Sequence, residues 1–219
     1  NRTDPVDGTI VMSNLCSEIL QVQQPSLLND KQEYEVLGTD ISCNLGSTNI
    51  PNLMKSPDFG KSVETMVRAL TYVTDHSSID AVPTIKNGND QAHTIGLGGM
   101  GLHTMFATNQ MHYGSPESIE FTDIYFMLLN YYTLAASNKI AKERGEAFVN
   151  FNKSSYYTGE YFDAYTDSDV VFQSEKVKHI FEGIKVPTKE DWLQLKQAVR
   201  ESGLYHQNRL AIAPTGSIS

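Results

Sequence analysis

The sequence has only two cysteines, Cys16 and Cys43, in 219 residues, and it contains no Cys-x-x-Cys pair. Disulfide-rich secreted proteins carry many more cysteines, so free thiols in a reducing compartment are expected. No apolar run reaches the ~18 residues that span a bilayer, and no secretory signal is visible near Asn1. We therefore expect a cytoplasmic protein without a membrane partner.

Basic residues are also scarce. Lys and Arg number 17 against 26 Asp and Glu, which gives a formal net charge of -9. Nucleic-acid surfaces need clustered Lys and Arg, so no nucleic-acid partner is expected. Backbone N–H groups bind phosphate without net positive charge, so a phosphorylated small molecule stays compatible with this composition. The six histidines lack an HExxH or Cys-x-x-Cys companion, so we expect no metal site.

Three short segments are predicted to be strands. Residues 9–13 are rich in β-branched side chains and should be extended. Residues 39–47 alternate polar and apolar side chains, with Cys43 on the apolar face and Gly46 ending the strand. Residues 209–214 form the third predicted strand. A chain of this length with 40% hydrophobic residues suits one large domain or two small ones, and it can bury a core.

Helical periodicity separates these strands. Residues 61–75 repeat apolar side chains every three or four positions. The longest predicted helix follows Ser115, a natural N-cap, and stops before Gly145; its middle is apolar nearly all round and should be buried. Two more helices are expected at residues 173–183 and 188–202, the second with a capping box. Strands separated by helices favour the α/β class.

Two segments between these elements are glycine-rich or polar. Residues 94–106, "TIGLGGMGLHTMF", predict a strand or loop that leads into a helix. Their G-x-G-x-x-G spacing lacks an acidic residue about 20 positions on, so we interpret the glycines as a sign of tight packing. Residues 150–169 are rich in Tyr and Ser and predict a surface loop.

The stretch "SNLCSEI" places an amide, a thiol and a carboxylate at every second position, Asn14, Cys16 and Glu18. In an extended segment these side chains share one edge, about 6.6 Å apart, with Leu15 and Ile19 as apolar walls. A thiolate is favoured by basic neighbours, and none is near in sequence. Cys16 should therefore stay S–H at neutral pH, a form suited to hydrogen-atom chemistry, and Glu18 is a candidate general base.

The last residues, "APTGSIS", follow a predicted strand with hydroxyls and a glycine. Such a turn can hold phosphate on its N–H groups, although small Ser/Thr/Gly turns are often only turns. Three interpretations of the cysteines also stay open at this point. They are core residues, as isolated cysteines often are; a Cys16–Cys43 disulfide; or a Cys16 nucleophile paired with a histidine.

Four motifs in order, "SNLCSEI", "DISCNLGS", "GLGGMGLH" and "APTGSIS", resemble the large catalytic subunit of class I ribonucleotide reductase, and are closest to the class Ib type. The resemblance covers residues 8–219. Members of that family are much longer, so the chain resembles an internal segment. The resemblance implies a ten-stranded α/β barrel of two parallel five-stranded halves. This chain would form roughly the second half, including a finger loop that carries the catalytic cysteine.

The resemblance also assigns roles. Cys16 matches the cysteine whose thiyl radical takes the 3′ hydrogen atom of a ribonucleoside diphosphate. Glu18 matches the base for the 3′-hydroxyl proton, and Asn14 the amide that hydrogen-bonds the ribose hydroxyls. Cys43 matches one of two reducing cysteines; its partner is absent from this chain. The residues matching the turn that holds the substrate diphosphate are Thr215, Gly216, Ser217 and Ser219.

The implied cofactor is a dinuclear metal and tyrosyl radical in a separate small subunit, with none bound by this segment. The implied partners are that radical-generating subunit, a thioredoxin- or glutaredoxin-like reductant, the remainder of the large subunit, and a second copy in a homodimer. We expect the segment to be inactive alone. The alternatives are a thiol-nucleophile hydrolase or transferase, and a non-enzymatic α/β domain that binds a phosphorylated ligand.

Overall fold

The computed structural model describes residues 5–77 and 79–218. Its centre is a pair of parallel strands, β3 (Asn44–Asn49) and β4 (Ile95–Met100), paired without a break from Asn44 opposite Ile95 to Asn49 opposite Met100. On the other side of β4, Leu97 forms a parallel bridge with Leu210. Three parallel segments therefore lie side by side, and the α/β class is confirmed.

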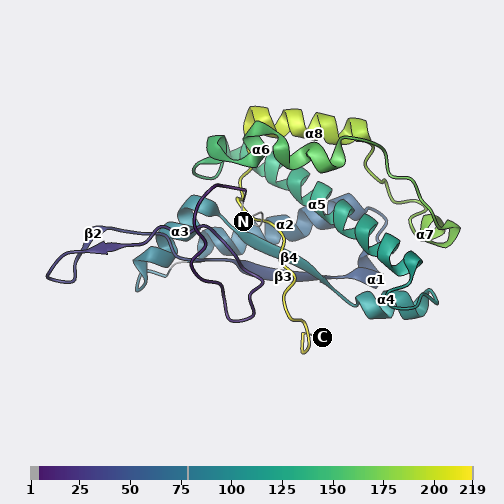
Figure 1. The fold of residues 1–219 in the computed structure, drawn as a ribbon, viewed down its shortest axis with the longest axis horizontal. Coiled ribbons are helices and arrows are strands. Elements are labelled where there is room, and N and C mark those ends of the chain that lie inside the picture. The colour runs from purple at the N-terminus through teal and green to yellow at the C-terminus, as the bar shows by residue number, and fades with distance from the viewer. Residues whose placement is uncertain (1–4, 78, 219) are drawn as a thin grey trace.

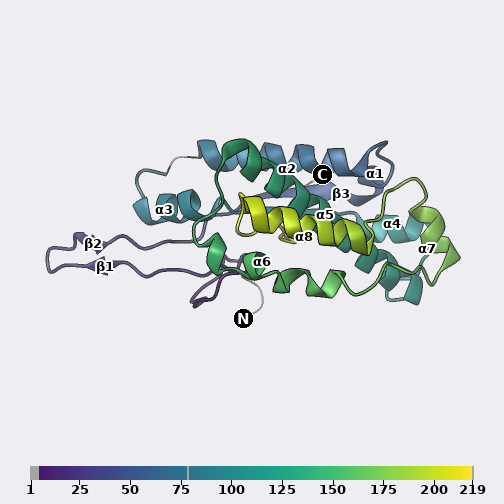
Figure 2. The ribbon, with the colours of Figure 1, turned by 90° about the horizontal axis from the view of Figure 1, so that it is seen from above.

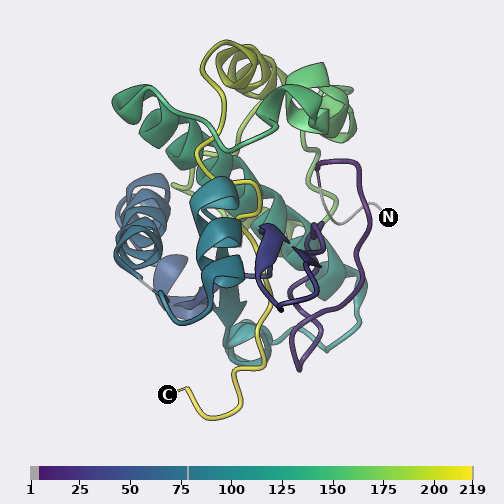
Figure 3. The same ribbon diagram turned by 90° about the vertical axis from the view of Figure 1, so that its left-hand side faces the viewer.

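Parallel strands need a crossover, and helices supply it here. The chain passes from β3 through α1 (Ile50–Leu53), α2 (Phe59–His76) and α3 (Pro83–Ala92) before it enters β4. The helix predicted at residues 61–75 is confirmed as α2, which buries Val63, Val67 and Leu70. Figure 3 shows α2 on one side of the strands and the N-terminal segment on the other.

The long helix α5 (Pro116–Arg144) forms the middle of the core. Ser115 caps its first turn, Pro116 opens it and Gly145 ends it in the left-handed conformation, as the sequence predicts. Its fully buried side chains include Phe121, Tyr125 and Leu128. Figure 1 shows α5 between the strands and the outer helix α8 (Lys189–Ser202). Because α5 is covered on both sides, its apolar residues surround the whole helix.

The remaining elements surround this core. Strand β4 leads directly into α4 (Leu102–Thr108), as predicted. Helix α8 begins with the predicted capping box between Thr188 and Asp191. An antiparallel hairpin of β1 (Leu27–Leu28) and β2 (Tyr34–Val36) projects away from the body, as Figure 2 shows.

Five predictions about the elements were wrong or only partly right. Residues 9–13 form no strand: Val11 and Met12 are exposed, and no neighbouring strand pairs with them. Strand β3 starts after Cys43 and continues through Gly46, because the ladder with β4 continues. The segment 209–214 contributes only the Leu210 bridge.

The segment 150–169 is not a plain loop, and the predicted helix 173–183 is shorter than expected. The first contains three short helices, η1 (Phe151–Lys153), α6 (Ser155–Thr158) and η2 (Glu160–Tyr165). They form because Tyr156 and Phe162 bury their rings in a hydrophobic cluster with Trp192 of α8. The second is α7 (Glu175–Ile180), capped by Ser174.

The expected barrel is shown only in part. The described residues hold three parallel segments and do not close a barrel. The N-terminal segment that should form the finger loop lies beside these strands, and a finger loop is not evident.

Within the described part of the chain, no helix is both long and apolar enough to cross a membrane.

The glycines of β4 permit a close approach of three backbones, as the sequence predicts. A Cβ on Gly98 would lie well inside van der Waals distance of the Ala211 carbonyl oxygen. One on Gly96 would lie 2.9 Å from the Cys43 Sγ. The sheet therefore has no room for side chains at these two positions.

We expect Gly98→Ala to lower the free energy of unfolding by about 1–3 kcal/mol, because the clash is with rigid backbone. Urea unfolding of the chain measures this. Gly216→Ala is the matched control, since nothing lies within 4 Å of a Cβ there; we expect a change within about 0.5 kcal/mol. Equal stabilities for the two variants would contradict the packing argument.

Candidate active site

The motif "SNLCSEI" forms a turn. The Ser17 N–H donates to the Asn14 carbonyl oxygen at 3.1 Å, and Ser17 has a positive φ of 63°. The Ile19 N–H donates to the side-chain Oδ1 of Asn14 at 3.0 Å. The predicted extended alternation of Asn14, Cys16 and Glu18 is therefore wrong. The chain reverses at Cys16 and Ser17, so the three side chains do not line one extended edge.

The predicted apolar walls are half right. Ile19 is buried at 6% exposure, whereas Leu15 at the tip of the turn is 99% exposed. Cys16 follows Leu15 and is exposed as well. The thiol is thus accessible to a large reactant, and both cysteines are free thiols rather than a Cys16–Cys43 disulfide.

Glu18 and Cys43 lie together in a cavity of about 250 Å³, which we call the thiol cavity. Its other lining residues are Ile19, Leu20, Gln21, Thr94, Ile95, Asn208 and Leu210. Burial, and secondarily the negative charge of Glu18, raise the pKa of the Cys43 thiol to about 12. Cys43 is therefore held as S–H, and Gly96 provides the space beside its sulfur.

The small-residue turn belongs to the C-terminal segment and lies beside strand β3. The turn occupies Gly216 and Ser217, as predicted. Thr215 and Ser217 line a second cavity of about 420 Å³, which we call the turn cavity, together with β3 residues that include Gly46 and Ser47. Nothing would obstruct a Cβ on Gly216, so the backbone here is open to a ligand. Ser219 lies outside the described residues.

Strand β3 brings these two cavities together. Cys43 immediately precedes the strand and faces the thiol cavity, while residues 45–47 line the turn cavity. Of the predicted site residues, the structure therefore joins Glu18 to Cys43 and places Thr215 and Ser217 one cavity away. Asn14 and Cys16 stay in their turn and line neither cavity.

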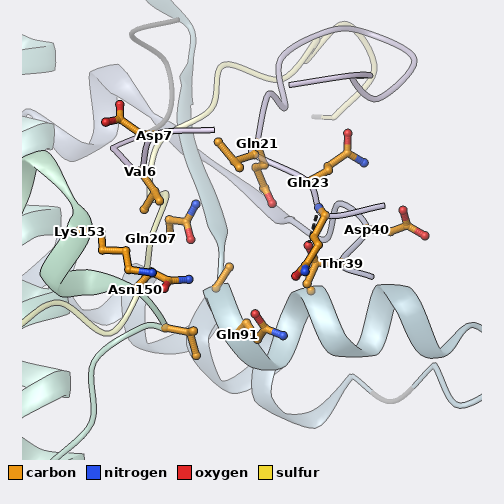
Figure 4. Close-up of a pocket in the computed structure, with 15 residues that line it drawn as sticks. Val6, Asp7, Gln21, Gln23, Thr39, Asp40, Gln91, Asn150, Lys153 and Gln207 are labelled. Carbon is orange, nitrogen blue, oxygen red and sulfur yellow. Dashed lines mark hydrogen bonds between the residues drawn. The ribbon is translucent and has the colours of Figure 1, made fainter. Parts of the chain in front are cut away.

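A third cavity, of about 210 Å³, lies beside the N-terminal segment and contains none of the predicted residues. Figure 4 shows its amide-rich lining, with Gln21, Gln91, Asn150 and Gln207 around it and Lys153 at its edge. Gln21 also lines the thiol cavity, and its Nε2 donates to the Ser42 carbonyl oxygen at 3.2 Å. This residue therefore separates the two spaces.

Sequence reasoning missed Gln21, Thr94 and Asn208 in the thiol cavity. Thr94 comes directly before the buried strand β4. A polar residue at that position is the only feature of the sequence that could have indicated its place in the thiol cavity. Asn208 and Gln21 come from distant segments, so only the fold brings them in.

Among the described residues, no group of three or more His, Cys, Asp or Glu side chains is placed to hold a metal ion.

Fold and site together define an α/β domain in which a protonated thiol and a carboxylate share a cavity beside a small-residue turn. The model of the family "Ribonucleotide reductase, barrel domain" matches residues 1–219. The chain belongs to this family.

Curated relatives carry matching names. The chain is 46% identical over 210 residues to the ribonucleoside-diphosphate reductase subunit alpha of Bacillus subtilis (strain 168), covering 96% of this chain and 30% of the relative. It is 42% identical to the Mycoplasma pneumoniae subunit of the same name, covering all of this chain and 31% of that relative. A Chlamydia pneumoniae subunit alpha is 29% identical over 97% of this chain and 19% of its own length. The chain thus spans less than a third of these relatives.

The two thiols should differ sharply in reactivity. With its pKa raised to about 12, Cys43 is almost entirely protonated at pH 8, and its side chain is only partly exposed. We expect iodoacetamide to modify the exposed Cys16 at least ~100-fold faster than Cys43 in the folded chain. Peptide mass spectrometry measures both rates. In unfolding concentrations of urea the rates should converge; equal rates in the folded chain would contradict the burial of Cys43.

Proposed function

We propose that this chain is a segment of the catalytic barrel domain of a ribonucleotide reductase large subunit, with no separate second domain. In the cytoplasm it takes part in reducing ribonucleoside diphosphates to deoxyribonucleoside diphosphates, the precursors of DNA. The observation that carries this proposal is the thiol cavity, where Glu18 and Cys43 meet beside the small-residue turn. Family membership favours this reaction over a hydrolase, a transferase or a non-enzymatic binding domain.

In the proposed reaction Cys16 is the residue that becomes a thiyl radical. Its place at an exposed turn supports this role, because an electron and a proton must leave the thiol before substrate reacts. The thiyl sulfur then takes the 3′ hydrogen atom of the ribose, which restores S–H and leaves a carbon radical. Asn14 hydrogen-bonds the ribose hydroxyls through its amide.

Glu18 accepts the 3′-hydroxyl proton, and one reducing thiol gives a proton to the 2′-hydroxyl, which leaves as water. Once C2′ is reduced, Cys16 returns its hydrogen atom to C3′. The reducing equivalents come from two thiols, Cys43 and a cysteine outside this chain. Together they supply two electrons and two protons and end as a disulfide. The raised pKa of Cys43 supports this role, because a protonated thiol carries the hydrogen that the substrate radical needs.

The diphosphate is proposed to lie on the small-residue turn. Thr215 and Ser217 offer hydroxyls at the turn cavity, and Ser219 extends the same series. Gly216 lets the backbone N–H groups approach the phosphate oxygens. Within residues 5–77 and 79–218, no lysine or arginine lines this cavity, so charge neutralisation would fall to N–H dipoles and to the remainder of the subunit.

The proposed partners follow from the same assignment. The remainder of the large subunit completes the barrel and supplies the second reducing cysteine, and the complete subunit forms a homodimer. A radical-generating small subunit with a dinuclear metal and tyrosyl radical supplies the oxidising equivalent. A thioredoxin- or glutaredoxin-like protein reduces the disulfide after each turnover.

Two substitutions in the complete large subunit test the site. We expect Cys16→Ser to abolish deoxynucleotide formation, because a serine hydroxyl cannot replace the thiyl radical. We expect Glu18→Gln to lower kcat by about 10²-fold, the usual contribution of a general base. Product is measured by chromatography with a ribonucleoside diphosphate and the small subunit. Glu35→Gln on the exposed strand β2 is the matched control and should keep wild-type activity. Wild-type rates in Cys16→Ser would refute the proposal.

The 219-residue chain alone, mixed with the small subunit and a dithiol, should form no deoxynucleotide, since it carries only one of the two reducing cysteines. The complete subunit is the positive control in the same assay. Sustained product formation by the chain alone would overturn the assignment of Cys43 as half of a pair.

A further inference from the structure

The thiol cavity contains two buried oxygen atoms without a partner among the described residues. They are the Glu18 Oε2 and the Thr94 Oγ1. Thr94 is 1% exposed, so its hydroxyl cannot turn to bulk solvent. Glu18 and Thr94 come from two different segments that line the cavity, the N-terminal segment and the residue before β4.

Leaving such groups unpaired is costly. A buried hydroxyl or carboxylate oxygen without a hydrogen bond destabilises a protein by roughly 1–3 kcal/mol, and more when charged. Nearly all such atoms in folded proteins find a partner, either protein or ordered water. A cavity of about 250 Å³ with several polar groups on its wall is large enough and polar enough for water.

We propose that Thr94 is a positioning residue for Glu18 and acts through a water molecule in the thiol cavity. The Thr94 hydroxyl and this water hydrogen-bond each other, and the water donates a hydrogen to the Glu18 Oε2. The donated bond fixes the carboxylate in the cavity. Thr94 itself touches no reacting atom.

No charged side chain on the cavity wall, among the described residues, donates a hydrogen bond to the Glu18 Oε2. Cys43 is the one further titratable side chain that lines the cavity in the described chain, and it is a protonated thiol. Arg209 follows a lining residue but does not itself line the cavity. Its two terminal nitrogens donate to the Tyr156 hydroxyl at 2.6 Å and the Asn130 Oδ1 at 3.1 Å, while its buried Nε has no partner among the described residues. His93 precedes Thr94, and its ring lies 3.9 Å from Asp75. We therefore assign a water molecule as the hydrogen-bond donor to the Glu18 Oε2.

This inference rests on the proposed role of Glu18 as general base. An ionised, oriented carboxylate accepts the 3′-hydroxyl proton, and a misplaced or protonated one does not. Loss of the Thr94 hydroxyl should therefore slow the chemical step.

The test compares Thr94→Val, Thr94→Ser and Thr133→Val in the complete large subunit. Prereduced enzyme, small subunit and a ribonucleoside diphosphate are mixed without external reductant, and single-turnover rates are followed from pH 6 to 9. Thr133 is also fully buried, but its hydroxyl donates to the Asn130 carbonyl oxygen on α5, outside the cavity. Thermal unfolding of each variant reports on the fold.

We expect Thr94→Val to lower the rate about tenfold. Thr94→Ser keeps a hydroxyl and should stay within about twofold of the wild type. Thr133→Val should retain the wild-type rate. A crystal structure of the complete subunit should show a water within hydrogen-bonding distance of both side chains.

Two results would overturn the inference: a wild-type rate for Thr94→Val, or equal losses of rate in the Val and Ser variants. Failure of the proposed function itself looks different. It would appear as a Glu18→Gln variant with wild-type activity, whatever the Thr94 variants do.

Discussion

The site depends on the close approach of three parallel backbones at β4. Because Gly96 and Gly98 have no side chains, β4 and the Leu210 segment can lie close together. A Cβ on either glycine would clash with backbone or side-chain atoms. Because this approach is tight, Thr94 at the entrance of β4 and Asn208 beside it reach the same cavity as Cys43. The glycines therefore set the geometry of a site to which they contribute no side chain.

Strand β3 converts this packing into a site. Its register with β4 fixes Cys43 at one end, facing Glu18, and residues 45–47 further along, facing the small-residue turn. Helices α2 and α5 hold the strand from behind with the main apolar core. Strand β3 thus places the thiol beside the carboxylate of the N-terminal segment and its later residues beside the C-terminal turn, an arrangement that suits a proposed reaction with several hydrogen and proton transfers.

Local signals predicted the helices well, whereas the irregular segments depended on distant contacts. Ser115, Pro116 and Gly145 act on their own turns, so the limits of α5 could be read from the sequence. The segment around Tyr156 was predicted to be a loop. Its helical turns depend on aromatic burial against α8, and the local sequence gives no sign of that contact. The alternation in "SNLCSEI" was misleading for a similar reason: without a neighbouring strand, the segment turns at Ser17. The motif itself led to the right family, but the meeting of Glu18 with Cys43 and Thr94 required the fold.

The central claim is that Cys43, and not Cys16, is left oxidised after turnover, while Cys16 only passes through a radical. Mass spectrometry of the prereduced complete subunit after one turnover, quenched in acid with iodoacetamide mapping, tests this directly. We predict one disulfide per deoxynucleotide formed, between Cys43 and a cysteine outside residues 1–219, with Cys16 recovered as free thiol. A Cys16–Cys43 disulfide, or product formed with Cys43 still reduced, would contradict the account.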